Sequence, residues 1–248
     1  MIEPSTKGVV ENFIKTLLMS GRRVASEKWQ ACHEKNVGFY DMLEICDLFA
    51  RMRITENSKQ LAEDIGADLP WADDHFMERV SGIPSNPGKE YANWPYWKVD
   101  GKYMQGQIFS HTYQERFWPP SKTGIRYKAG DLSDIVQRLS KDKTTRQAFL
   151  SIWHPEDQSN NDVRVPCTIG YWFKIQDDLL NITYLIRSCD ARRHLRNDVY
   201  MTQRLAKYVM EYLNCNGHKI GLGIMSMWIG SLHCFDSDIL YLKKKVKW

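Results

Sequence analysis

The chain has 248 residues, of which 43% are hydrophobic and 26% are charged, so it can bury a core and is neither a disordered nor a fibrous protein. Its 34 basic and 30 acidic residues give a net charge of +4, which suits a phosphate-bearing small substrate but is too weak to indicate a nucleic-acid surface. No linker divides the sequence, and a single domain over residues 1–248 is predicted.

The cysteines and the N-terminus predict the compartment. Six cysteines are dispersed without a Cys-x-x-Cys pair or a Cys/His group at zinc-binding spacing, so no metal site is expected. No cationic stretch precedes an apolar run of signal-peptide length, and no apolar run is long enough to span a membrane. A cytoplasmic protein without a membrane partner is therefore expected.

The first half of the chain predicts two helices and a long irregular region. Apolar residues recur at helical spacing over residues 9–18 and stop before Gly21. Residues 38–54 alternate imperfectly and fit either a strand or a helix. Asn57 is a typical N-cap for a helix that continues to residue 65. Residues 84–120 are rich in Pro, Gly, Asn and aromatic residues, which favours loops.

The second half predicts a sheet flanked by helices. A helix is expected to begin at Asp131, and a long helix capped by Asn197 or Asp198 is expected to end at Leu213. The predicted strands cover residues 146–153, 167–176, 179–188 and 219–229, the second and third joined by a tight turn at Asp177-Asp178. Because these elements follow no repeating βαβ order, the predicted class is α+β.

Four short motifs carry the candidate chemistry: Val165-Pro166-Cys167-Thr168, Arg187-Ser188-Cys189-Asp190, Arg196-Asn197-Asp198, and Gly230-Ser231-Leu232-His233-Cys234-Phe235. Their order and spacing resemble the thymidylate synthase superfamily, with a convincing match over residues 127–240. The resemblance implies a single domain in which a mixed sheet packs against helices and one sheet face forms a homodimer interface. It also implies a pyrimidine nucleoside monophosphate as substrate and 5,10-methylenetetrahydrofolate as the one-carbon donor.

The resemblance assigns roles to individual residues. Cys167 would be the nucleophile that adds to C6 of the pyrimidine, and Arg187 would supply positive charge that favours the reactive thiolate. Arg187 and Ser188 would bind the phosphate. Arg146 would reach across the dimer to the partner's phosphate site, where Gln147 replaces a second arginine usual in the family.

Further roles concern the sugar and the folate. His233 would bind the ribose 3′-hydroxyl, and Phe235 replaces the usual tyrosine, which leaves the choice of sugar open. Asp190 would contact the folate, or it would cap a local turn. Aromatic residues of the loop region would border the folate and the pyrimidine: Tyr91, Trp94 and Trp97.

Two positions favour cytosine over uracil. Asp198 stands where thymidylate synthases have Asn, and a carboxylate accepts a hydrogen bond from the exocyclic amine of cytosine; the alternative reading is a helix cap. Thr168 follows the nucleophile, as in phage deoxycytidylate hydroxymethylases. Water addition needs a general base, for which Glu63 is expected and Glu56 is the rival, although either carboxylate could simply be solvated. His194 replaces a family glycine.

The resulting hypothesis is hydroxymethylation of dCMP, in the host cytoplasm if a phage encodes the chain. Alternatives are C5 methylation of dCMP or dUMP, and hydroxymethylation of CMP or dUMP. A different class of function is a noncatalytic nucleotide or single-stranded nucleic-acid binder that stacks bases on its aromatic loops. Retention of Cys167 beside the phosphate motif argues against simple binding.

Overall fold

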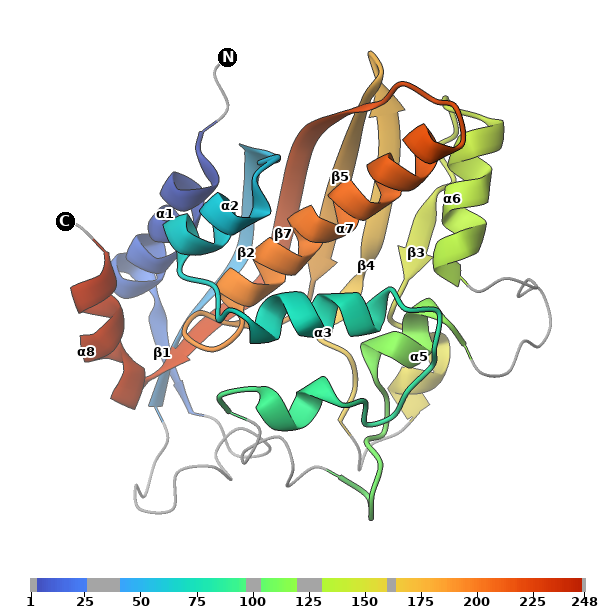
Figure 1. Ribbon diagram of the computed structural model, residues 1–248. Coiled ribbons are helices and arrows are strands. Elements are labelled where there is room, and N and C mark those ends of the chain that lie inside the picture. Colours follow the sequence, from blue (N-terminus) through green and yellow to red (C-terminus); the bar gives the residue numbers. More distant parts are fainter. Residues whose placement is uncertain (1–3, 26–40, 97–103, 120–130, 160–163, 247–248) are drawn as a thin grey trace.

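A computed structural model describes residues 4–25, 41–96, 104–119, 131–159 and 164–246. A seven-stranded mixed sheet forms its centre, with the strand order β1-β2-β7-β5-β4-β3 and with β6 paired to β7 (Figure 1). Strands β5 and β6 run parallel to β7, and the other pairs are antiparallel. The strands are β1 (Arg22–Ala25), β2 (Asp41–Arg53), β3 (Phe149–Ser151), β4 (Thr168–Gln176), β5 (Leu179–Ile186), β6 (Cys189–Asp190) and β7 (Gly221–Phe235).

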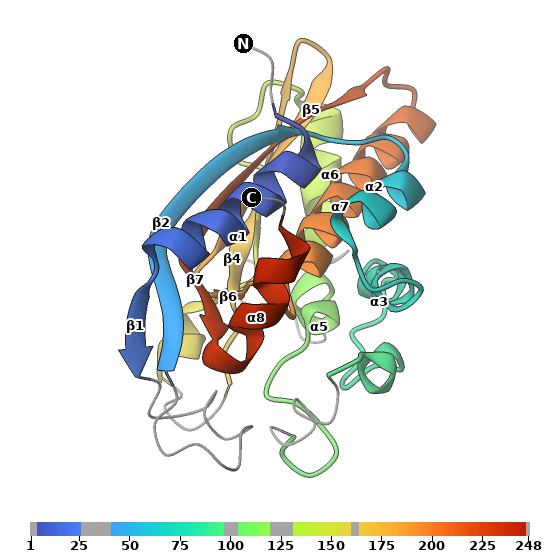
Figure 2. The ribbon, with the colours of Figure 1, turned by 90° about the vertical axis from the view of Figure 1, so that its left-hand side faces the viewer.

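The helices gather on the concave side of the curved sheet (Figure 2). The longest of them, α7, crosses the middle of the sheet, and α3 lies beside its N-terminal half (Figure 1). The helices are α1 (Thr6–Ser20), α2 (Ser58–Ile65), α3 (Trp71–Arg79), η2 (Glu90–Asn93), α5 (Tyr113–Phe117), α6 (Asp131–Lys141), η4 (Pro155–Ser159), α7 (Leu195–Cys215) and α8 (Asp236–Lys245). The predicted α+β class is confirmed.

Local sequence signals explain several elements. Helix α1 ends at Gly21, as predicted, and the Asn57 side chain caps α2 by accepting a hydrogen bond from the Gln60 amide at 3.1 Å. The β4–β5 hairpin turns at Asp177 and Asp178, whose φ angles of 53° and 55° are those of a two-residue hairpin turn. The ambiguous segment 38–54 contains strand β2 rather than a helix.

Other sequence predictions were wrong in their bounds. Helix α7 begins at Leu195, so Asn197 and Asp198 lie inside its first turn instead of capping it. Strand β3 is shorter than the predicted segment 146–153, and β7 continues beyond residue 229 to Phe235. Helices α3, α5 and α8 were not predicted, because each depends on packing more than on a long amphipathic pattern.

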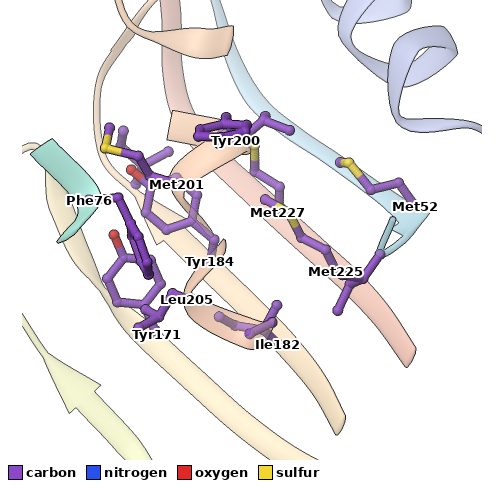
Figure 3. Packing of buried hydrophobic residues seen from close by; sticks show 14 of the residues in the cluster. Met52, Phe76, Tyr171, Ile182, Tyr184, Tyr200, Met201, Leu205, Met225 and Met227 are labelled. Atoms are coloured by element: carbon purple, nitrogen blue, oxygen red, sulfur yellow. The ribbon is translucent and has the colours of Figure 1, made fainter. Parts of the chain in front are cut away.

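The two sheet faces differ. On the concave side, side chains of β4, β5 and β7 pack against α3 and α7, as Figure 3 shows for Tyr171, Tyr184, Phe76 and Leu205. Other large apolar residues of the strands are exposed: 59% of the surface of Phe49 on β2 and 36% of that of Trp172 on β4 are accessible. No helix in the described ranges has the length and apolar character to cross a bilayer.

Candidate active site

Cys167 and Arg187 lie together at one end of the β4–β5 hairpin. Cys167 directly precedes β4 and is half-buried, while Arg187 directly follows β5. The Arg187 amide donates to the Cys167 carbonyl at 2.9 Å. The Arg187 guanidinium donates to the carbonyls of Pro166 at 2.9 Å and Val165 at 3.2 Å. The antiparallel register therefore fixes the predicted nucleophile beside the predicted phosphate-binding arginine, and Ser188 follows, half-buried.

Thr168 connects the nucleophile loop to the half-buried Tyr113 and the buried Tyr184. Its Oγ1 lies 3.0 Å from the Tyr113 hydroxyl and 2.9 Å from the Tyr184 hydroxyl, and only 1% of Thr168 is exposed. Burial and the neighbouring Cys167 raise the pKa of Tyr113 to about 12, so this phenol keeps its proton at neutral pH. Sequence reasoning missed Tyr113, although Thr112 and Glu115 form a capping box that marks the start of α5.

Asp198 is available for a role other than helix capping. Its carboxylate is half-buried in the first turn of α7, and Oδ2 lies 3.9 Å from the Cys189 sulfur. Burial raises the pKa of Asp198, while the charges of His194 and Arg79 act in the opposite direction. Because Cys189 is the only side chain bonded to it among the described residues, the carboxyl group retains capacity for a ligand.

One face of α3 carries aromatic and cationic side chains that contact η2 and α5 and form a wall. Trp71, His75 and Arg79 are spaced four residues apart, so they share this face. Trp71 stacks on His75 with 5.0 Å between ring centres. Burial lowers the pKa of His75 to about 4, so its imidazole is neutral at pH 7. Arg79 lies over the ring of Tyr113, with its guanidinium carbon 4.1 Å from the ring centre.

Trp94 closes this wall at the N-terminus of α7. Its ring centre lies 5.7 Å from that of Trp71 and 4.9 Å from that of His194. His194, which replaces a family glycine, thus packs its ring against Trp94. Trp94 is 5% exposed, and its buried Nε1 has no hydrogen-bond partner among the described residues. Tyr91 packs edge-on against Phe109 of its own loop region. The predicted Trp97 lies outside the described residues.

Asp190 stabilises the turn that leads into α7. Its Oδ1 accepts hydrogen bonds from the amides of Arg192 and Arg193 at 2.8 and 2.9 Å, and its Oδ2 pairs with Nη1 of Arg193 at 2.9 Å. Arg193 also pairs with Asp238 at 2.6 Å. Burial opposes ionisation of Asp190, but the Arg193 charge outweighs it and holds the pKa below its usual range. The turn-capping alternative is thus realised, and folate contact stays a prediction.

The sugar candidates lie next to this ion-pair network. His233 is opposite Asp190 in the β6–β7 register and is 3% exposed. Burial lowers the pKa of His233, so its imidazole is neutral at pH 7. Phe235 is edge-on to His233 with 6.2 Å between ring centres, and the Arg193 guanidinium carbon lies 5.0 Å from the Phe235 ring.

The structure does not bring three further candidates to Cys167. Arg146 is exposed before β3, in an open hollow of about 760 Å³ that Arg138 and Lys141 also line. Glu63 is exposed on α2, and no interaction within the described ranges joins it to Cys167 or Asp198. Glu56 is exposed before α2, where its carbonyl accepts a hydrogen bond from Lys207.

Known proteins are similar to this chain over most of its length. The family described as Thymidylate synthase matches residues 76–247. Two proteins named "Putative thymidylate synthase" are similar: one of Methanococcoides burtonii is 31% identical over 183 residues, covering 70% of this chain and 77% of that protein. One of Methanosarcina mazei is 30% identical over 200 residues, covering 79% and 76%. Thermostable thymidylate synthase A from Bacillus subtilis shares the fold, with a TM-score of 0.72 and 13% identity over 98% of this chain and 84% of that chain. This chain belongs to the thymidylate synthase family.

Proposed function

We propose that this chain transfers one carbon from 5,10-methylenetetrahydrofolate to C5 of a pyrimidine nucleoside monophosphate, and that it hydroxymethylates dCMP. The observation that carries the choice of cytosine is Asp198. Its carboxyl group is not used as a helix cap, and burial raises its pKa. A carboxyl group that holds its proton more readily can donate to N3 of cytosine while accepting from the exocyclic amine.

The residues around Cys167 support nucleophilic chemistry. In the proposed first step, the Cys167 thiolate adds to C6, and the electrons of the C5=C6 bond move toward C5 and N3 of the base. A proton from Asp198 at N3 would neutralise the charge that accumulates on the ring. Tyr113, which keeps its proton, is hydrogen-bonded to Thr168, the residue that follows Cys167.

The phosphate and dimer assignments have separate support. Nε and Nη2 of Arg187 are used by main-chain carbonyls, and Nη1 has no hydrogen-bond partner among the described residues. This donor can bind a phosphate oxygen together with Ser188. The accessible Phe49 and Trp172 on the sheet offer an apolar surface for a homodimer. In such a dimer, the exposed Arg146 would serve the partner's phosphate site.

The wall of α3 and Trp94 has the chemistry to hold a flat heterocycle. Trp71 stacks on Trp94, the ring of Trp94 is tilted against that of His194, and the buried Nε1 of Trp94 is a donor without a partner in the described chain. Methylenetetrahydrofolate, when bound, supplies the one-carbon unit. Trp94 and Trp97 would hold its ring system, and Asp190 would contact it through Oδ2, which accepts one hydrogen bond from Arg193 and keeps a second lone pair.

Tritium release from C5 of labelled dCMP, CMP and dUMP, measured with methylenetetrahydrofolate, tests the proposal. We expect release from dCMP by the wild-type protein and none by Cys167→Ala. Asp198→Asn should shift the preference toward dUMP, because an amide can donate to O4 and accept from N3–H. An unchanged preference would refute the base-reading role of Asp198, and persistent release by Cys167→Ala would remove the nucleophile.

The names of the relatives favour a second candidate, which is C5 methylation of the thymidylate synthase type. The two reactions share the addition of Cys167 and differ in whether water or hydride completes the product. The mass of the purified product separates hydroxymethyl from methyl. If the chain turns over none of the three nucleotides but binds oligonucleotides with a steep salt dependence, the noncatalytic alternative holds instead.

A further inference from the structure

Arg79 is a buried cation that has no anionic partner in the part of the chain that the structure describes. It is the last residue of α3, and 7% of its surface is exposed. Its carbonyl accepts a hydrogen bond from Trp118 Nε1 at 2.8 Å, which fixes the backbone. Its Nε is buried without a hydrogen-bond partner, and its side chain forms no ion pair with the described residues. The guanidinium lies over the Tyr113 ring.

The surrounding groups do not neutralise this charge. Glu78, the adjacent carboxylate, is committed to Gln114 Nε2 at 2.7 Å and to the Lys89 amide at 2.5 Å. Asp198 on α7 senses the Arg79 charge without forming an ion pair with it. Three other described groups on which the Arg79 charge acts are neutral at pH 7: His75 on α3, Tyr113 on α5 and Tyr171 on β4.

An unpaired guanidinium in such a place is unfavourable for folding. Its position has a chemical meaning, however, because the Tyr113 ring that it covers is bonded to Thr168, the residue after Cys167. Arg79 is thus linked to Cys167 through Tyr113 and Thr168, and its charge also acts on Asp198, the proposed reader of the base. Buried donors without partners in native proteins commonly mark a ligand or a catalytic role.

We propose that Arg79 is a catalytic residue whose guanidinium donates a hydrogen bond to the bound pyrimidine base and stabilises the negative charge formed when Cys167 adds to C6. The inference rests on the proposed function. In this step the Sγ–C6 bond forms, the C5=C6 π bond breaks, and its electron pair spreads over C5 and, through the C4=N3 bond, over N3. Arginine donates a hydrogen bond without transferring its own proton. It can therefore act together with Asp198, which supplies a proton to N3.

The test compares Arg79→Met and Arg79→Lys with the wild type in the C5 tritium-release assay. Methionine keeps the apolar volume and removes the charge, so we expect kcat to fall about 100-fold, as when one preorganised donor is lost, with KM changed less than threefold. Arg79→Lys should retain part of the rate. Because removal of an unpaired buried charge relieves the folded state, Arg79→Met should also melt at the wild-type temperature or about 2–4 °C above it.

Arg204→Met is the matched control. Arg204 is on α7 and contacts α3, the helix that carries Arg79. Its guanidinium carbon lies 5.1 Å from the ring centre of Phe76, and its Nε pairs with Asp73 at 2.8 Å. It should keep the wild-type rate. Three results would overturn the role of Arg79: an Arg79→Met rate within threefold of wild type, a marked loss of its folding or melting temperature, or a Lys variant no faster than Met. A wild-type protein that releases no tritium from any nucleotide would refute the proposed function itself, and this inference with it.

Discussion

Replacing Thr168 with valine should destabilise the protein through two tyrosines that the mutation does not touch. Valine has nearly the shape of threonine but lacks the hydroxyl that lies 3.0 Å from Tyr113 and 2.9 Å from Tyr184. Thr168 is only 1% exposed, so water cannot easily replace that hydroxyl. Each buried hydroxyl left without a partner costs about 1–3 kcal/mol, and the added apolar group returns about 0.8 kcal/mol. The free energy of unfolding should therefore fall by about 1–5 kcal/mol for the two hydroxyls together.

Urea unfolding followed by circular dichroism measures this loss. Protein concentration must be equal for all variants, because dimerisation would stabilise the folded state by mass action. Thr168→Ser is the control: it keeps the hydroxyl, loses one methyl group and should cost only about 1 kcal/mol. A valine variant that loses less than the serine variant would show that the bridge between the tyrosines does not contribute to stability.

Three further predictions concern the ion-pair network and the open sheet face. Arg193→Met leaves the carboxylates of Asp190 and Asp238 without their shared cation and should cost about 3–5 kcal/mol in urea unfolding; a loss below 1 kcal/mol would contradict the network. The pKa of Asp190 is depressed in the folded protein, so its stabilising contribution is present above the unfolded pKa of about 3.9 and is lost as the pH falls through the folded value; a melting temperature independent of pH from 5 to 2 would oppose this. Trp172→Glu places a charge on the accessible sheet face and should convert a dimer to monomers in sedimentation velocity, whereas an intact dimer would place the interface elsewhere.

The elements that the sequence predicted are those whose signals are local. Residues 9–18, the Asn57 cap and the Asp177-Asp178 turn each depend on neighbouring residues, and each is present in the structure. Helix α3 has no such signal, since Pro70 precedes it and provides no side-chain cap. The first turn of α7 was misjudged because Asn197 and Asp198 are good caps in isolation. The structure instead starts that helix after the turn that Asp190 holds.

The sequence alone therefore determined the α+β class and the pairing of Cys167 with Arg187, because both residues belong to one hairpin whose strands and turn are encoded locally. Only the tertiary structure decided what surrounds them. Arg79, Tyr113 and Asp198 come from three helices distant in the chain, and they converge because α3, α5 and α7 pack on the same sheet face. Such convergence depends on nonlocal burial of apolar surface, which no window of neighbouring residues contains.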